Sequence, residues 1–120
     1  MNTHLKSIFD SNLTDGEKLL LIYLMDVEEK NFNIIISTNA HVLASKYKFS
    51  LRSIYSYLNT LCDNGILYKA KVKSQSNSVY ILIPAITNDH IQKTLPSLVN
   101  LFEFDIHEIE NLAKRCTVKV

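Results

Sequence analysis

The stretch from Thr38 to Lys73, TNAHVLASKYKFSLRSIYSYLNTLCDNGILYKAKVK, decides the fold. It opens with Thr38 and Asn39, either of which can cap a helix that ends near Tyr47. The apolar residues of this helix are Ala40, Val42, Leu43 and Ala44. The segment Lys46–Phe49 then predicts a short polar and aromatic turn that lacks glycine. The stretch therefore begins with a short helix and a tight turn.

A longer helix is predicted after the turn. Ser50 is a good N-cap, and Gly65 stands where the end of a helix favours a residue with positive φ, so the helix should run to Asn64. At about 100° per residue, one face carries Leu51, Ile54, Leu58 and Leu61, and the opposite face carries Arg52, Ser56 and Asn59, with Ser53 and Tyr55 at its flanks. The apolar face predicts packing on other helices, which leaves the polar face to solvent or to a partner.

A two-stranded hairpin is predicted next. Positions 66, 68, 70 and 72 alternate with Leu67 and the lysines Lys69, Lys71 and Lys73, so this strand has one basic face. Residues 74–77 are typical of a turn, and a β-branched strand from position 78 to 83 is closed by Pro84.

Three elements are predicted before this stretch. Thr14-Asp15-Gly16-Glu17 forms a capping box, and the helix that it starts is expected to run to about Glu29. Residues 19–25 are apolar in every direction around the helix axis, which predicts burial on more than one side. The segment Phe32–Ile36 predicts a brief strand, and residues 3–10 predict a short amphipathic helix.

The tail is predicted to be helical. Residues 89–100 form one helix that Pro96 restarts or kinks, and Asp105-Ile106-His107-Glu108 starts another. An apolar stripe along both helices comprises Leu95, Leu98, Val99, Leu101, Ile109 and Leu112. Because this stripe is large for a chain of 120 residues, we expect it to be the interface of a homodimer.

This order of elements resembles the winged helix-turn-helix. Residues 13–21 (LTDGEKLLL) and 37–68 resemble the first helix and the helix-turn-helix core of modules in plasmid and phage replication-initiation (DnaD-like) proteins and in small bacterial regulators. The resemblance implies a mainly α fold with a small β-hairpin wing and additional N- and C-terminal helices. It also implies a DNA-binding domain with its core at residues 13–84. With the N-terminal helix this domain spans residues 1–84, and the apolar stripe marks residues 85–120 as a self-associating tail. In such folds the third helix enters the major groove and the wing lies along the DNA backbone.

The charge distribution agrees with a nucleic-acid partner. Residues 38–84 have a net charge of +5, whereas residues 1–37 have −3 and residues 85–120 have −1. Arginine pairs with guanine, asparagine pairs with adenine, and lysine neutralises phosphate. The expected DNA-contacting residues are Lys46, Lys48, Ser50, Arg52, Ser53, Tyr55, Ser56, Asn59, Lys69, Lys71, Lys73, Gln75 and Asn77.

Several other classes of protein are excluded. The longest apolar run has seven residues, far from the roughly 20 of a membrane span, and no secretion signal is visible, so a cytoplasmic location is expected. The two cysteines and four histidines lack metal-ligand spacing, and two glycines in the whole chain argue against a phosphate-binding loop. We therefore expect no metal, no cofactor and no enzymatic activity.

Three functions stay open. The first is a transcriptional regulator that reads duplex DNA. The second is a replication-initiation or accessory protein of a plasmid, phage or mobile element, with a possible replication-protein partner, which binds forked or single-stranded DNA. The unpaired bases of that DNA would stack on some of the aromatic residues Tyr47, Phe49, Tyr55, Tyr57, Tyr68 and Tyr80. The third is a winged helix that serves as a protein-interaction adaptor.

Overall fold

The computed structural model describes residues 13–27, 30–75 and 77–118, so the helix expected at residues 3–10 lies outside the described residues. The helices are α2 (Asp15–Met25), α3 (Ala40–Tyr47), α4 (Leu51–Asp63), α5 (Leu95–Leu98) and α6 (Ile106–Val118). The strands are β1 (Lys30–Asn31), β2 (Ile35–Ile36), β3 (Leu67–Val72), β4 (Ser78–Leu82) and β5 (Phe102–Glu103). They form one antiparallel sheet in the order β1-β2-β4-β3-β5. This mainly helical fold with a small sheet is compatible with a winged helix-turn-helix, as predicted.

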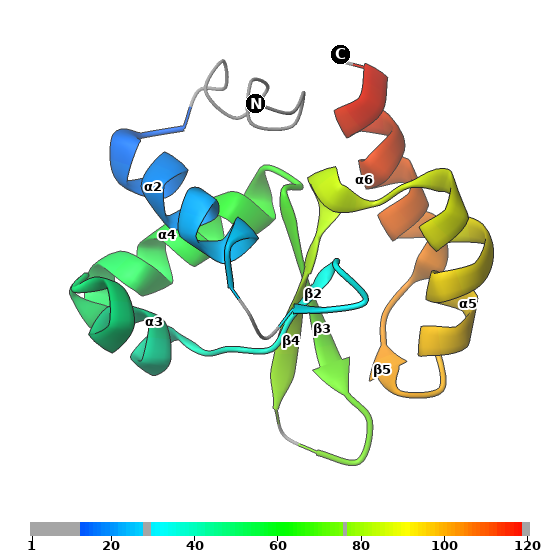
Figure 1. Cartoon of the computed structure of the whole chain (residues 1–120), viewed down its shortest axis with the longest axis horizontal. Helices are drawn as coiled ribbons and strands as arrows, with labels where there is room; N and C mark the ends of the chain where they lie inside the picture. Colours follow the sequence, from blue (N-terminus) through cyan, green and yellow to red (C-terminus); the bar gives the residue numbers. More distant parts are fainter. Residues whose placement is uncertain (1–12, 28–29, 76, 119–120) are drawn as a thin grey trace.

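The sheet separates two layers of helices. Helices α2, α3 and α4 lie on one side of it, and α5 and α6 lie on the other (Figure 1). Side chains alternate along the strands, so Ile36 and Leu82 enter one core while Ile35 and Ile81 enter the other. Strand β2 and the adjoining end of β4 are therefore buried on both faces, as in sheets that have helices on either side.

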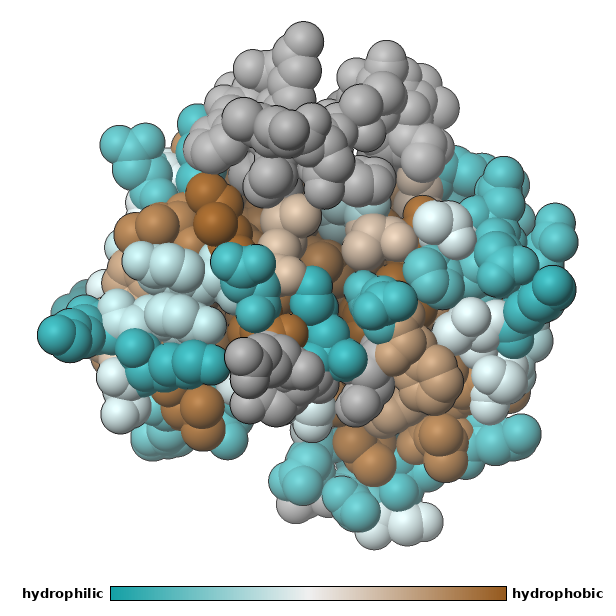
Figure 2. Space-filling view, viewed as in Figure 1, coloured by the Kyte–Doolittle hydropathy of each residue, from teal (hydrophilic) through white to brown (hydrophobic). Residues whose placement is uncertain are grey.

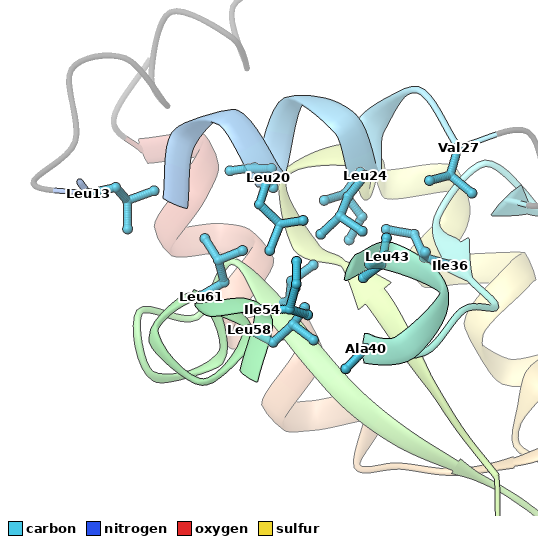
Figure 3. Close-up of a cluster of buried hydrophobic side chains, with 13 residues drawn as sticks. Leu13, Leu20, Leu24, Val27, Ile36, Ala40, Leu43, Ile54, Leu58 and Leu61 are labelled. Carbon is cyan, nitrogen blue, oxygen red and sulfur yellow. The ribbon is translucent and has the colours of Figure 1, made fainter. Parts of the chain in front are cut away.

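The first core joins the three N-terminal helices. Its buried side chains include Leu20 and Leu24 of α2, Leu43 of α3, and Ile54, Leu58 and Leu61 of α4, which point toward one another in Figure 3. The predicted apolar face of α4 is thus confirmed. Each of these leucines and isoleucines is at most 2% exposed, and full burial of such a side chain contributes about 1.5–3 kcal/mol.

Helix α2 starts as predicted but is shorter. The backbone N–H of Thr14 donates to Glu17 Oε1 at 2.8 Å, and the N–H of Glu17 donates to Thr14 Oγ1 at 3.3 Å, which completes the capping box. The helix ends at Met25 and not near residue 29, and the ammonium of Lys30 in β1 donates to the carbonyl of Met25. Leu20, Leu21 and Leu24 are fully buried, whereas Leu19 is 40% exposed, so burial does not extend around the whole helix.

The strand predicted at residues 32–36 is the second half of a small hairpin. Phe32 and Asn33 have positive φ angles of 58° and 63° and form the turn between β1 and β2. Two successive residues with positive φ match the turn whose twist suits a tight β-hairpin. Only the two isoleucines of β2 are extended, and they join β2 to β4.

The tail supplies the second core. Leu95, Leu98 and Ile109 are 0%, 1% and 0% exposed and pack against the sheet, so these three residues are not a free surface for a second copy. The other members of the apolar stripe are the half-buried Val99 and Leu112 and the exposed Leu101. A large apolar stripe was the reason to expect a homodimer, and much of it is explained by packing within the chain.

Pro96 perturbs the tail helix as expected. The segment η2 (His90–Thr94) is π-helical and leads directly into α5, and the N–H of Leu95 donates to the carbonyl of His90, five residues earlier. Proline has no N–H for the next bond of the helix, so the register changes at this point. Thr87 precedes the helix, and its Oγ1 accepts the N–H of His90 at 3.2 Å.

Strand β5 was not predicted from the sequence. It pairs with β3 through Lys71 opposite Glu103 and Val72 opposite Phe102, and it attaches the tail to the edge of the hairpin. Residues on both sides of position 84 therefore share one sheet and one core.

Candidate nucleic-acid interface

Helix α4 presents a polar face because its apolar face is fixed in the first core. Ser50 caps its N-terminus, and the Oγ of Ser50 accepts the backbone N–H of Ser53 at 3.1 Å. The face opposite Ile54, Leu58 and Leu61 leaves Arg52, Ser56 and Asn59 exposed. This is the arrangement that the 3.6-residue period predicts.

The end of α3 and the turn that follows it add two lysines to this surface, because α3 continues to Tyr47, one residue beyond the predicted start of the turn at Lys46. Asn39 caps α3 by accepting the N–H of Val42 at 3.0 Å, and the helix ends at Lys48, which has φ 60° and ψ 33°. Glycine usually occupies this left-handed conformation, so a lysine here costs conformational energy. Lys46 and Lys48 are exposed, and the ammonium of Lys46 lies 5.5 Å from the ring centroid of Tyr47.

The lysines of the wing lie on the same side of the sheet as α4. We define the wing as β3, β4 and the turn between them. Leu67 packs in the first core, and Lys69 and Lys71 follow it at alternate positions, so they face the same side. Lys73 follows the end of β3, and its backbone N–H donates to the carbonyl of Leu101 at 2.9 Å. All three lysines are exposed.

The tip of the wing is a polar turn. Ser74 has a φ of 66°, and the N–H of Val72 donates to the carbonyl of Asn77 at 3.0 Å. The side-chain amide of Asn77 donates to Gln75 Oε1 at 3.4 Å, and both residues are exposed. Exposed amide groups can exchange a hydrogen bond of this kind for one to a ligand.

The cations of this surface form no ion pair with any described residue. They are Lys46, Lys48, Arg52, Lys69, Lys71 and Lys73. The ion pairs of the described chain instead join Lys93 to Asp89 and Lys114 to Glu110, on the tail. A cation that forms no ion pair does not have to break one before it contacts a phosphate.

Two weakly acidic groups are half-buried where α4 meets the wing. Burial raises the pKa of the Cys62 thiol, and the nearby Lys69 lowers it by a smaller amount. Burial also raises the pKa of the Tyr80 hydroxyl, with further contributions from Cys62 and Tyr55. Both groups are therefore neutral at pH 7, and neither reduces the positive charge of the surface.

Four half-buried aromatic residues of α2, α3, the turn and α4 contact one another and do not form a row of exposed rings. Tyr23 of α2 stacks on Tyr47 with the ring centroids 4.2 Å apart and the planes at 8°. Phe49 packs edge-on against Tyr57, with the centroids 5.7 Å apart. These contacts hold α2, the turn and α4 together, which is a structural role.

Tyr68 lies on the other side of the sheet, in the second core. Its hydroxyl oxygen accepts the backbone N–H of Asp105 at 3.3 Å and donates to Glu108 Oε2 at 3.4 Å. It therefore binds the start of α6, on the face of the sheet away from the wing lysines, which disfavours the alternative in which Tyr68 stacks on unpaired bases. Among the aromatic residues considered for stacking, Tyr55 on α4 has an exposed side chain, with a relative exposure of 50%.

All thirteen predicted DNA-contacting residues lie at the end of α3, in the turn after it, in α4 or in the wing. They are exposed except Ser53, which is half-buried and shares a hydrogen bond of 2.8 Å with the hydroxyl of Ser50. The sequence did not identify Glu103, which β5 places opposite Lys71. A strand of two residues leaves no periodic pattern from which it could be found.

Two further properties concern residues 13–27, 30–75 and 77–118. Within these ranges, no helix is long and apolar enough to cross a membrane. The same part of the chain has no group of three or more histidine, cysteine, aspartate or glutamate residues that could hold a metal ion.

Residues 11–67 match a family model described as a helix-turn-helix domain. This range includes α2, α3 and α4, and it ends where the wing begins. Neither a search of curated proteins nor a search of solved structures gave a significant match. The helical part of the interface is thus similar to a helix-turn-helix domain, which supports DNA as the partner of this chain.

Proposed function

We propose that this chain is a transcriptional regulator that binds duplex DNA, with α4 in the major groove and the wing along the phosphate backbone. One observation is the main support for this proposal. The polar face of α4 and the lysines Lys69 and Lys71 lie on the same side of the sheet, are exposed, and form no ion pair with described residues. A surface with these properties is suited to a polyanion that extends past both elements.

In this proposal, α4 reads the bases. Arg52 lies in the first turn of the helix, where recognition helices contact base edges, and its guanidinium can pair with O6 and N7 of guanine. Asn59, two turns further on, can pair in the same way with adenine. Ser56 lies between them and contributes a short hydroxyl contact.

The turn and the wing hold the backbone. Lys46 and Lys48 before α4, and Lys69, Lys71 and Lys73 of the wing, neutralise phosphates, and Gln75 and Asn77 at the tip contact sugar or the minor groove. These contacts release counterions, so binding should weaken steeply as salt increases.

Duplex DNA is favoured over single-stranded DNA because the structure leaves few rings for stacking. Tyr47, Phe49 and Tyr57 contact other rings, and Tyr68 is bound to the start of α6. The alternative of a replication-initiation or accessory protein would be supported by preferential binding to forked or single-stranded DNA and by capture of a helicase or primase. An adaptor would bind no DNA even at low salt.

The proposal is tested with the double variant Arg52→Ala, Asn59→Ala, whose two side chains are exposed, so folding should be unchanged. A preferred duplex is first selected from a random pool with the wild-type protein. The variant should bind this duplex more weakly by about 1–3 kcal/mol for each lost base contact and should lose its preference over random duplex. Asn111→Ala, Arg115→Ala is the matched control, because it removes the same residue types from an exposed part of α6. Equal affinity of both variants for the selected duplex would show that α4 does not read DNA.

A further inference from the structure

Strand β5 places a carboxylate at the edge of the wing. In the antiparallel pair of β3 and β5, Glu103 is directly opposite Lys71, and Phe102 is directly opposite Val72. Directly opposed residues point to the same face of a sheet, with Cβ atoms about 4.5–5.5 Å apart. The register is also fixed by the hydrogen bond from the N–H of Lys73 to the carbonyl of Leu101.

The second core shows which face Glu103 occupies. Phe102 and Val72 both pack against the second core, between the sheet and the tail helices. Because side chains alternate along a strand, Glu103 and Lys71 point to the other face, which is the α4 side. In Figure 2, hydrophobic side chains gather over β5, and hydrophilic ones surround the tip of the wing below it.

Glu103 is exposed, and it forms no ion pair with a described residue. Its charge is therefore not cancelled by Lys71, although the two residues are neighbours across the strands. A phosphate that contacts Lys71 must come close to the Glu103 carboxylate. Two negative charges about 7 Å apart in water repel with an energy that lowers a binding constant about three-fold.

We propose that Glu103 limits the affinity of the wing for DNA by repelling the phosphate that Lys71 binds. This inference rests on the proposed function, because it requires the wing to contact the DNA backbone. It gives β5 a role beyond packing: the strand both fixes the edge of the wing and sets how tightly the wing holds phosphate.

The test compares DNA binding by Glu103→Gln and the wild type, measured by fluorescence anisotropy on one duplex at low salt. The variant keeps the shape of the side chain and should bind about two- to five-fold more tightly. The difference should shrink as salt is raised, because the repulsion is screened over about 3 Å at 1 M ionic strength. Glu110→Gln on α6 removes the same net charge from the tail side of the sheet and should leave affinity unchanged. The gain in affinity should also persist in a Lys71→Gln background, because Lys69 and Lys73 still hold the backbone at this edge and the repulsion acts on the phosphate and not on Lys71.

Each other outcome overturns the proposal in a distinguishable way. If Glu103→Gln and the wild type bind DNA equally, the role of Glu103 is wrong while the proposed function stands. If Glu110→Gln increases DNA affinity by the same factor, the change in net charge is the cause. If Glu103→Gln no longer increases affinity in the Lys71→Gln background, Glu103 acts by holding Lys71 and not by repelling the phosphate. If the wild type binds no DNA at low salt, the proposed function fails, and the role of Glu103 fails with it.

Discussion

Gly65 and Leu112 lie in contact between α4 and α6: a Cβ built on Gly65 would be 2.8 Å from Leu112 Cδ2. Gly65 has a φ of 72° and forms the joint between the end of α4 and the start of the wing. Helix α6 therefore packs against the joint that sets the angle between the two proposed DNA-contacting elements.

Gly65→Ala should lower the free energy of unfolding by about 1–2 kcal/mol, because a residue with a Cβ is strained in the left-handed conformation. Displacement of Leu112 should add to this loss. Urea denaturation measures the effect, and Gly65→Asn is the control because asparagine tolerates positive φ better than alanine. An alanine variant as stable as the wild type would contradict the described joint.

Ile109→Ala should destabilise the protein by about 2–5 kcal/mol, since Ile109 is fully buried in the second core. Leu101→Ala, in the same tail, should change stability by less than about 0.5 kcal/mol, because Leu101 is 53% exposed. Chemical denaturation of both variants compares them directly. If Ile109→Ala and Leu101→Ala both changed the free energy of unfolding by the same small amount, the tail would not be part of the folding unit.

Lys48→Gly should stabilise the fold while it weakens DNA binding. Glycine relieves the left-handed backbone of Lys48 and should add about 0.5–1 kcal/mol to the free energy of unfolding, whereas the lost charge should weaken binding to all DNA sequences. Ser74→Gly is the matched control, since Ser74 has a φ of 66° but no charge. It should gain stability and retain affinity. If Lys48→Gly binds DNA as tightly as Ser74→Gly does, the turn makes no contact with phosphate.

The parts of this fold that the sequence predicted are those with local signals. Thr14, Asn39 and Ser50 cap their helices as expected, and the alternation of lysines marks β3. These features depend on residues within one or two turns of each other. The thirteen candidate contacts could be named for the same reason, since helical and strand periodicity alone places a side chain on a face.

The parts that could not be predicted depend on contacts between distant residues. The apolar stripe of the tail has the same pattern whether it faces a second copy or the chain's own sheet, and only the fold shows that Leu95 and Ile109 are buried within the chain. Alternation placed Tyr68 on the face of β3 away from the lysines, but its hydrogen bond to the start of α6 depends on a segment far along the chain. Glu103 joins the candidate interface only through its pairing with Lys71, 32 residues earlier in the chain.

The central claim is that the wing holds the DNA backbone on the side of the sheet where α4 lies. The most direct measurement is the dependence of the duplex binding constant on salt for the variant Lys69→Ala, Lys71→Ala, Lys73→Ala. The slope of log K against log salt should become shallower by about three units, one for each lost phosphate contact, and sequence preference should survive. The control Lys93→Ala, Lys114→Ala, Arg115→Ala loses the same number of cations from the tail and should keep the wild-type slope. A triple wing variant with the wild-type slope would remove the wing from the interface and contradict this account.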